Sequence, residues 1–435
     1  MRKISYTYIL LYSLLVLGMG SLQAQMSKAK NGTFALKNAS LHTITNGTQT
    51  GTIIIQDGKI SAMGASVSIP SGAEEIDCSG LHIYPGMIDG GTTLGLSEIS
   101  SISLTNDYRE VGDLNPHMQA LTAVNPNAVA IPVTRVNGVT TVLAQPTGGI
   151  LPGTSALINL HGYTPDQMYA GFKAVRLLFP ATGRRSRFDR RSEEDMKKDL
   201  DKKLKRLNEV WDQAKAFAEV WDAHKAGKAE EPEYYPQMEA MVPVVKGEAK
   251  LLIEVNSASD ILSAITWCKD KGVDAIFTGV AEGWRVADKL AESKIPVITG
   301  PMLQNPRRSS DRYDKAYANP GIMQKAGVKV AIRTDESENV RNLPFNAGFA
   351  AAYGMGIEEA LKAVTINPAE IFGVSDHLGS LEVGKSATLF VSDGDPFETK
   401  TTISHLFIEG WNIPIDSRQI RLYDEFLDRA PGSKK

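Results

Sequence analysis

Cysteine is almost absent from this chain, which has 435 residues but only Cys78 and Cys268. Two cysteines are far too few for a disulfide-built scaffold, so a hydrophobic core must hold the fold together. The chain also lacks an excess of charge of either sign, since 47 basic and 50 acidic residues give a formal net charge of −3. This balance gives no electrostatic reason to expect binding to nucleic acid or to an anionic membrane surface. We therefore expect its partners to be small molecules or other proteins.

Long apolar runs are also scarce, and the clearest one stands at the start of the chain. The basic residues Arg2 and Lys3 are followed by a nearly continuous apolar stretch at 8–19. A stretch of about 12 residues is too short to span a bilayer but has the length of the apolar part of a signal peptide. We predict a signal peptide over residues 1–24, export across the inner membrane to the periplasm, and no membrane span after cleavage.

Two segments near the ends of the chain are rich in short β-branched runs. Residues 33–84 contain two such runs joined by Asp57-Gly58, a dipeptide typical of tight β-hairpins. Residues 378–415 have the same character, with glycines between the runs. We predict that the two segments together form one small split β-sandwich, followed by a C-terminal tail at 416–435.

The long middle, residues 85–377, alternates apolar strand-like runs with helical patterns, which indicates a parallel sheet wrapped by helices. Eight such runs predict an α/β fold of the (β/α)8 barrel type. The runs are Met87–Asp89, Val139–Ala144, Ser155–Leu160, Ala174–Phe179, Leu251–Val255, Ala275–Thr278, Val297–Thr299 and Val328–Arg333.

A densely charged segment at 183–247 interrupts this alternation. Ser192 to Asp195 has the pattern of a helix start, and apolar residues then recur three or four apart. We predict a long inserted helix that packs on the barrel through a stripe formed by Met196, Leu200, Leu204, Leu207, Trp211, Ala214, Ala218 and Trp221.

Three stretches carry a family resemblance. The first, YPGMIDGGTTLGL at 84–96, places Pro-Gly before an apolar pair and Asp89. The second is GVKVAIRTDE at 327–336, and the third, ALKAVTINPAEIFGVSDHLGSLEVGKSATLFVSDGDP, spans 360–396. With these stretches the chain resembles the amidohydrolase superfamily, in its imidazolonepropionase-like branch. The resemblance implies a barrel that holds one or two divalent metals and hydrolyses amide or imide bonds.

The metal ligands that the resemblance implies are mostly missing. Gly91 and Thr93 stand where the family has its His-any-His pair, and no two of the seven histidines have that spacing elsewhere. Glu254 is the only ionisable residue of the fifth run, while Thr278 or Gly279 stands at the sixth. A catalytic zinc needs about three protein ligands. We therefore expect no bound cofactor, in contrast to the zinc or similar divalent metal of active relatives.

Four residues remain as candidates for the site. Asp335, which the resemblance places at the eighth strand, is the candidate acid or base, with Glu254 as its support. Arg333 lies two residues before Asp335, so both side chains project to the same face of an extended segment. We predict that Arg333 pairs with Asp335 and replaces part of the metal's charge, although a surface arginine on a loop is the alternative. His161 follows the third run and is the best candidate for a histidine at the barrel mouth.

Three kinds of function are compatible with these residues. The resemblance favours a hydrolase of carbon–nitrogen bonds in linear or cyclic amides, acting on a small-molecule substrate. The missing ligands favour a catalytically inactive barrel that binds a ligand or an active amidohydrolase paralogue, as a homo- or hetero-oligomer. A purely structural role has no sequence feature in its favour.

Overall fold

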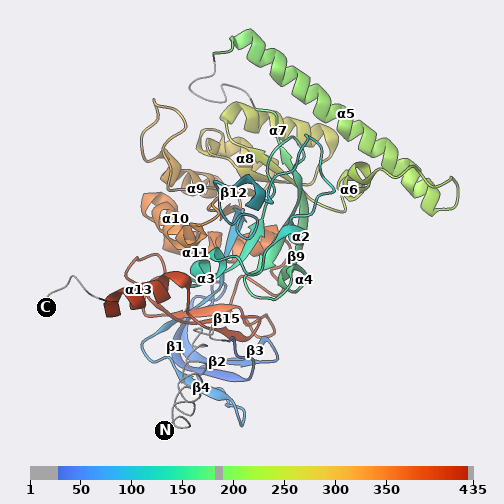
Figure 1. Ribbon diagram of the computed structural model, residues 1–435. Helices are drawn as coiled ribbons and strands as arrows, with labels where there is room; N and C mark the ends of the chain where they lie inside the picture. The colour runs from blue at the N-terminus through green and yellow to red at the C-terminus, as the bar shows by residue number, and fades with distance from the viewer. Residues whose placement is uncertain (1–27, 182–189, 430–435) are drawn as a thin grey trace, which may run out of the picture.

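The computed structural model describes residues 28–181 and 190–429. The predicted signal peptide at 1–24 and the last residues of the predicted tail lie outside these ranges. No helix within them combines the length and the apolar character that a membrane span requires. Figure 1 shows a barrel wrapped by helices and, below it, a smaller sheet formed by the blue and red ends of the chain.

The smaller sheet draws strands from both ends of the chain. Its order is β16-β15-β14-β5-β1-β2-β3, and β4 also pairs with β1. The ends of the chain meet where β14 pairs antiparallel with β5. The strands are β1 Phe34–His42, β2 Thr48–Gln56, β3 Lys59–Gly64, β4 Glu74–Asp77, β5 His82–Pro85, β14 Leu389–Ser392, β15 Ile403–Ile408 and β16 Trp411–Ile413.

The predicted sandwich is one continuous sheet that encloses its own core. Phe34 of β1 and Phe407 of β15 belong to distant parts of the sheet, yet their rings pack edge to face at 5.2 Å. The predicted hairpin joins β2 to β3, and both of its turn residues, Asp57 and Gly58, have positive φ angles of 51° and 78°. This is the backbone geometry that the Asp-Gly pair favours in two-residue hairpins.

All eight strands expected in the middle of the chain are present and form a second sheet. Its order is β13-β12-β11-β10-β9-β8-β7-β6, and the Asp335 amide donates to the Gly91 carbonyl at 3.0 Å across the remaining gap. The barrel is therefore nearly closed. The strands are β6 Met87–Thr92, β7 Val139–Ala144, β8 Gly153–Asn159, β9 Tyr169–Leu178, β10 Leu251–Val255, β11 Ala275–Gly279, β12 Val297–Thr299 and β13 Val330–Ile332.

One strand departs from an all-parallel barrel. The third strand, β8, runs antiparallel to both β7 and β9. Residues 145–152 link β7 to β8 without a helix. Antiparallel neighbours can be joined by short connections, whereas parallel neighbours need a long crossover. The carboxyl end of β8 therefore lies at the opposite end of the barrel from the carboxyl ends of the other seven strands.

The barrel interior is filled in layers. Each strand contributes one buried apolar residue to a lower layer, namely Ile88, Leu143, Leu157, Ala174, Leu252, Ile276, Ile298 and Ala331. Because side chains alternate along a strand, the residue two positions further on also points inward. Toward the carboxyl ends of the parallel strands, this second position brings polar residues into the interior. We call Gln145, Arg176, Glu254, Thr278 and Arg333 the polar layer.

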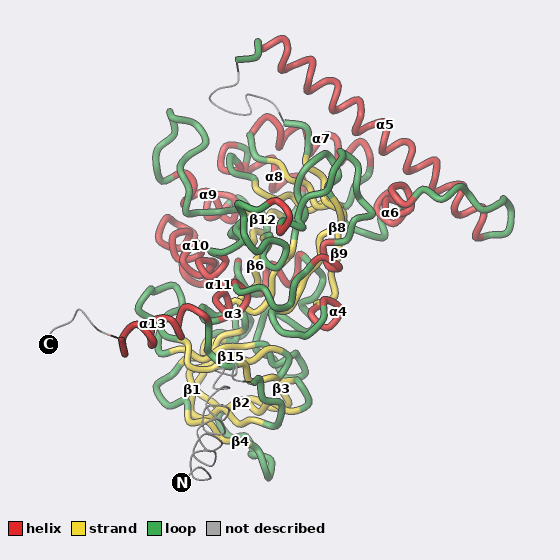
Figure 2. The backbone as a smooth tube through the Cα atoms, viewed as in Figure 1, coloured by secondary structure: helices red, strands yellow, loops and turns green. Residues whose placement is uncertain are grey.

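Helices surround the barrel, and the longest, α5, extends well past it (Figure 1; red in Figure 2). As predicted, α5 begins after Ser192, whose hydroxyl accepts a hydrogen bond from the Asp195 amide at 3.1 Å. Trp211 of its apolar stripe packs edge to face on Trp267 of α7 at 5.3 Å. The helices are α2 Ala120–Ala123, α3 Ala130–Arg135, α4 Pro165–Met168, α5 Glu193–Lys225, α6 Pro236–Val245, α7 Ala258–Lys271, α8 Ala287–Ser293, α9 Lys315–Lys325, α10 Leu343–Ala350, α11 Ile357–Ala363, α12 Ile366–Ile371 and α13 Arg418–Arg429.

Candidate functional site

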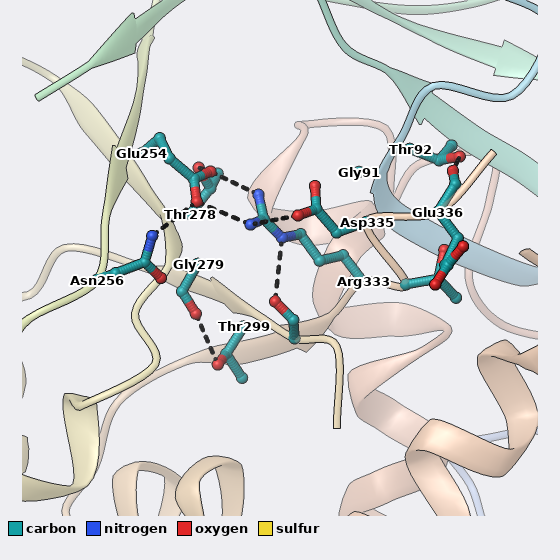
Figure 3. Close-up of polar contacts among 12 residues, drawn as sticks. Gly91, Thr92, Glu254, Asn256, Thr278, Gly279, Thr299, Arg333, Asp335 and Glu336 are labelled. Carbon is teal, nitrogen blue, oxygen red and sulfur yellow. Dashed lines mark hydrogen bonds and ion pairs between the residues drawn. The ribbon is translucent and has the colours of Figure 1, made fainter. Parts of the chain in front are cut away.

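A buried ion pair between Arg333 and Glu254 lies in the polar layer of the barrel (Figure 3). Arg333 donates from Nη1 to Glu254 Oε2 at 2.6 Å and from Nη2 to Oε1 at 2.8 Å. The Arg333 side chain is only 2% exposed and that of Glu254 is 16% exposed. Two parallel N–H···O bonds between a guanidinium and a carboxylate are the strongest and most directional form of this contact.

The two neighbouring strands and the residue after β10 complete the hydrogen bonds of Glu254. Thr278, which pairs with Glu254 in the sheet register, donates its hydroxyl to Oε2 at 2.7 Å. Arg176 of β9 donates from Nη2 to Oε2 at 3.0 Å, and Asn256 donates to Oε1 at 3.0 Å. The Glu254 carboxylate therefore lies between two guanidinium groups and is fully hydrogen-bonded.

Asp335 is the member of this cluster that is only partly buried. Its carboxylate Oδ2 lies 3.4 Å from Arg333 Nη2, and its side chain is 45% exposed. Its backbone has a φ of 54°, in the left-handed region. The predicted Arg333–Asp335 contact is present, but it is longer than the two bonds from Arg333 to Glu254. The main partner of Arg333 is thus Glu254, and the alternative of a surface arginine is wrong.

The charges of the cluster shift one another's pKa values. Burial alone would raise the pKa of Glu254, but Arg333 and then Arg176 hold it far below its usual range. Burial also opposes the charge of Arg333, yet Glu254 and Asp335 raise the pKa of Arg333 overall. For Asp335, burial raises the pKa, Arg333 opposes this, and Glu254 adds to it, so that the pKa ends above its usual value. Asp335 is therefore the carboxyl of this cluster best placed to exchange a proton.

The positions of the missing histidines are filled by other side chains. A Cβ at Gly91 would lie 2.6 Å from Oε1 of Gln145, whose buried amide has no hydrogen-bond partner among the described residues. A Cβ at Gly279 would lie 2.5 Å from Glu254 Oε1 and from the side chain of Asn256. The carboxylate and amides of this chain thus take up the space that histidine ligands would need.

These residues do not fit a divalent metal. The two carboxylates that could ligate one, Glu254 and Asp335, both face the fixed positive charge of Arg333. A metal ion beside this guanidinium would meet like-charge repulsion at short range. Within residues 28–181 and 190–429, no group of three or more His, Cys, Asp or Glu side chains is arranged to hold a metal ion.

Asp89 joins the first strand of the barrel to the eighth. It is fully buried, and it accepts hydrogen bonds from the Gly91 amide at 2.9 Å and from the Thr334 amide at 3.1 Å. The Thr334 hydroxyl donates a hydrogen bond to the second carboxylate oxygen of Asp89, Oδ2, at 2.5 Å. Burial is the main cause that raises the pKa of Asp89 to about 7, although these hydrogen bonds oppose the shift.

His161 lies away from this cluster. It follows the antiparallel strand β8, so it stands at the end of the barrel opposite the mouth, where its ring packs against Trp411 of the small sheet at 5.5 Å. The Leu160 amide before it donates to the carbonyl of Thr140, near the start of β7. The prediction that His161 faces the barrel mouth is therefore wrong, because it assumed a parallel third strand.

Sequence reasoning missed Arg176, Gln145 and the role of Asp89. Arg176 had a visible signal, since a cation inside an apolar strand needs a buried partner. Asp89 also had a visible signal, because it is an acidic residue within a buried strand. Gln145 follows β7 directly, and nothing in the sequence marks it.

Comparisons with known proteins agree with this architecture. A family model described as "Amidohydrolase family" matches residues 248–412. Imidazolonepropionase from Porphyromonas gingivalis strain W83 is 26% identical over 398 residues, which covers 84% of this chain and 88% of that protein. Imidazolonepropionase from Syntrophobacter fumaroxidans is 38% identical, but over only 84 residues, so the match spans 20% of that protein's length.

A solved structure shows the same fold. The amidohydrolase from Thermotoga maritima MSB8 superposes with a TM-score of 0.76 at 24% identity, covering 88% of this chain and 99% of that one. The split small sheet and the barrel of this chain are thus both parts of a known architecture. The family-model match and the imidazolonepropionases that align over 84% of the chain support the amidohydrolase superfamily, in its imidazolonepropionase-like branch, as the family of this chain.

Proposed function

We propose that this protein hydrolyses a carbon–nitrogen bond of a linear or cyclic amide without a catalytic divalent metal. Family membership supports the reaction class, because the homologues that cover most of the chain are imidazolonepropionases. The observation that carries the proposal is Asp335, an exposed carboxyl with a raised pKa at the mouth of the barrel. Because the shift moves the pKa of Asp335 upward from its usual acidic value, it favours the use of this carboxyl as a general acid or base.

In this proposal Asp335 accepts a proton from the attacking water and later donates it to the leaving nitrogen. Asp335 itself stays unmodified, so the net change is the addition of water across the carbon–nitrogen bond. The charge balance of the cluster supports the negative transition state. Arg176 and Arg333 contribute two positive charges, whereas Glu254 and Asp335 contribute two negative ones. When Asp335 takes up a proton, one positive charge is left uncompensated beside the developing oxyanion.

A second candidate is a catalytically inactive barrel that binds a small molecule or an active amidohydrolase paralogue. The saturated hydrogen bonds of Glu254 favour it, because Arg333 uses one N–H of each Nη atom on Glu254, and that edge of the guanidinium is therefore not open to a substrate oxygen. In this case the barrel mouth would bind a ligand but not turn it over.

The first experiment measures hydrolysis of simple amides, dipeptides and hydantoins by the purified protein. We expect Asp335→Asn to lower the rate by about 10²–10⁴-fold, the usual contribution of a positioned acid or base. Glu230→Gln, which changes an exposed carboxyl between α5 and α6, serves as the control and should have no effect. Zinc, manganese and chelators should also leave the rate unchanged.

Two results would contradict the proposal. A rate that depends on added metal and is lost in Asp335→Ala would mean that the ligands have been misidentified. Saturable ligand binding without hydrolysis of any substrate would support the inactive barrel instead.

A separate prediction concerns location. The apolar stretch at 8–19 after the basic start supports export, with cleavage near Ala24. Fractionation of the producing cells, followed by mass spectrometry of the N-terminus, should find the shortened chain outside the cytoplasm. An intact chain that retains Met1 and stays in the cytosol would show that the stretch is not a signal peptide.

A further inference from the structure

A cavity of about 430 Å³ lies between the small sheet and helix α11. Its walls come from β1 and β5, from α11, and from the loop that follows β14. Tyr84, one of its residues, lies in β5 shortly before the first barrel strand begins at Met87, whereas Asp335 follows the last barrel strand. The cavity therefore lies toward the opposite end of the barrel from the polar layer. We call it the sheet–helix cavity.

Tyr84 gives this cavity a polar group that nothing else in the described chain uses. Its ring is stacked between His42, at 4.1 Å, and Phe390, at 5.4 Å, which fixes its orientation. The residue is only 5% exposed, and its hydroxyl has no hydrogen-bond partner among the described residues. The hydroxyl is not one of the fully buried polar atoms without a partner, so it stays accessible and can accept a hydrogen bond from a ligand in the cavity that Tyr84 lines.

The imidazole of His42 contributes no positive charge to the cavity. Its Nε2 lies 3.0 Å from His82 Nδ1, and its Nδ1 lies 3.1 Å from the Thr48 hydroxyl. Burial and then the neighbouring His82 lower the pKa of His42 to about 4. At neutral pH the ring is therefore uncharged, and both of its nitrogens already have partners.

The remaining charges make the cavity negative. Asp395 and Glu358 both line it, and only one oxygen of Asp395 has a partner, the Phe397 amide at 2.9 Å. The cation on its wall, Lys362, is held by Glu359 at 2.7 Å. Two carboxylates thus face a space whose nearby positive charge is already neutralised.

A second, mainly apolar cavity of about 480 Å³ adjoins the first. Ile357, Asp395 and Phe397 line both cavities. Two exposed apolar side chains border the apolar cavity. Phe349 is 40% exposed and Ile357 is 61% exposed. Each volume lies within the range of roughly 300–1,000 Å³ that small-molecule sites occupy. The two together offer a negative end and an aromatic end.

We propose that the sheet–helix cavity and its apolar neighbour bind an organic ammonium ion that carries an aromatic body. The ammonium has three N–H donors and no acceptor. The free oxygen of Asp395, the Glu358 carboxylate and the Tyr84 hydroxyl oxygen supply three acceptors at one end. The aromatic body packs against Phe349, Ile357 and Phe397 at the other end. This site is independent of Asp335 and of the hydrolase proposal.

The test titrates the full chain with 2-(4-fluorophenyl)ethylamine and follows the fluorine NMR signal. We expect saturable binding, and binding at least tenfold weaker for 3-(4-fluorophenyl)propan-1-ol, which lacks the charge, and for 4-fluorophenylacetate, which reverses it. This ligand series uses only the wild-type protein, so it does not depend on the folding of any variant. Asp335→Asn should bind the amine as the wild type does.

Variants then locate the site. Asp395→Asn should weaken binding of the amine at least about tenfold, and Tyr84→Phe, which keeps the stacked ring, about three- to fivefold. Glu230→Gln should bind like the wild type. Equal binding by Asp395→Asn and the wild type, tighter binding of the acetate than of the amine, or no saturation by the amine would each overturn the proposal. If Ile357→Asp changed the oligomeric state in sedimentation while the amine failed to bind, the surface would instead be an interface between copies of this chain.

Discussion

Replacing Arg333 by alanine is expected to lower the free energy of unfolding by about 3–5 kcal/mol, the usual result of removing one partner from a buried ion pair. The loss arises because Glu254 then keeps its buried charge with only Arg176 as a counter-ion. Urea denaturation monitored by circular dichroism measures it. Arg206→Ala is the matched control, because this arginine of α5 is 48% exposed and forms only a surface pair with Glu209. That substitution should cost about 1 kcal/mol or less.

Double-mutant cycles show whether Glu254 or Asp335 is the partner that contributes more to the stabilisation by Arg333. We expect Arg333→Ala and Glu254→Gln to be strongly coupled, with an interaction energy of about 2 kcal/mol or more, because their side chains share two direct hydrogen bonds. Arg333→Ala and Asp335→Asn should be coupled by about 1 kcal/mol or less, because Asp335 is half exposed and 3.4 Å away. Additive losses for Arg333 and Glu254 would show that the guanidinium does not replace a metal's charge.

Asp89→Asn is expected to change the pH dependence of stability. The pKa of Asp89 is raised in the folded protein from 3.8 to about 7, so the folded state holds a proton that the unfolded state releases. The stabilisation from this proton is fully present below pH 3.8 and is lost as the pH rises toward 7. The total loss over this interval is on the order of 4 kcal/mol. Asparagine does not titrate, so the Asp89→Asn variant should not show this loss of stability.

The measurement is the difference in unfolding free energy between wild type and Asp89→Asn at several pH values. This difference should shrink by several kcal/mol between pH 4 and pH 7.5. Glu230→Gln, at an exposed site, should stay within about 0.5 kcal/mol of the wild type throughout. A constant difference for Asp89→Asn would mean that folding leaves the pKa of Asp89 unchanged, and a difference that grows with pH would mean that the carboxylate is the stabilised form. In that case the hydrogen bonds from Gly91 and Thr334 would outweigh burial.

The positions of the strands and the family resemblance were predictable from the sequence, because both depend on local residue patterns. Each of the eight predicted runs forms a strand, and the Asp57-Gly58 turn joins β2 to β3. The direction of β8 was not predictable, because an apolar run reads the same in both directions. Because the direction of β8 was predicted incorrectly, His161 was expected at the mouth of the barrel, whereas it lies at the opposite end.

The candidate site divides in the same way. The sequence by itself determined that Gly91 and Thr93 leave no histidine pair, and that Arg333 and Asp335 share one face of a strand end. Only the tertiary structure decided which carboxylate Arg333 binds. Glu254 lies 79 residues earlier in the chain, and the barrel brings it within 2.6 Å of the guanidinium. Closing the sheet sets that distance, because each strand turns every second side chain toward the same enclosed interior. There a buried arginine pairs most strongly with the carboxylate that is itself least exposed to water.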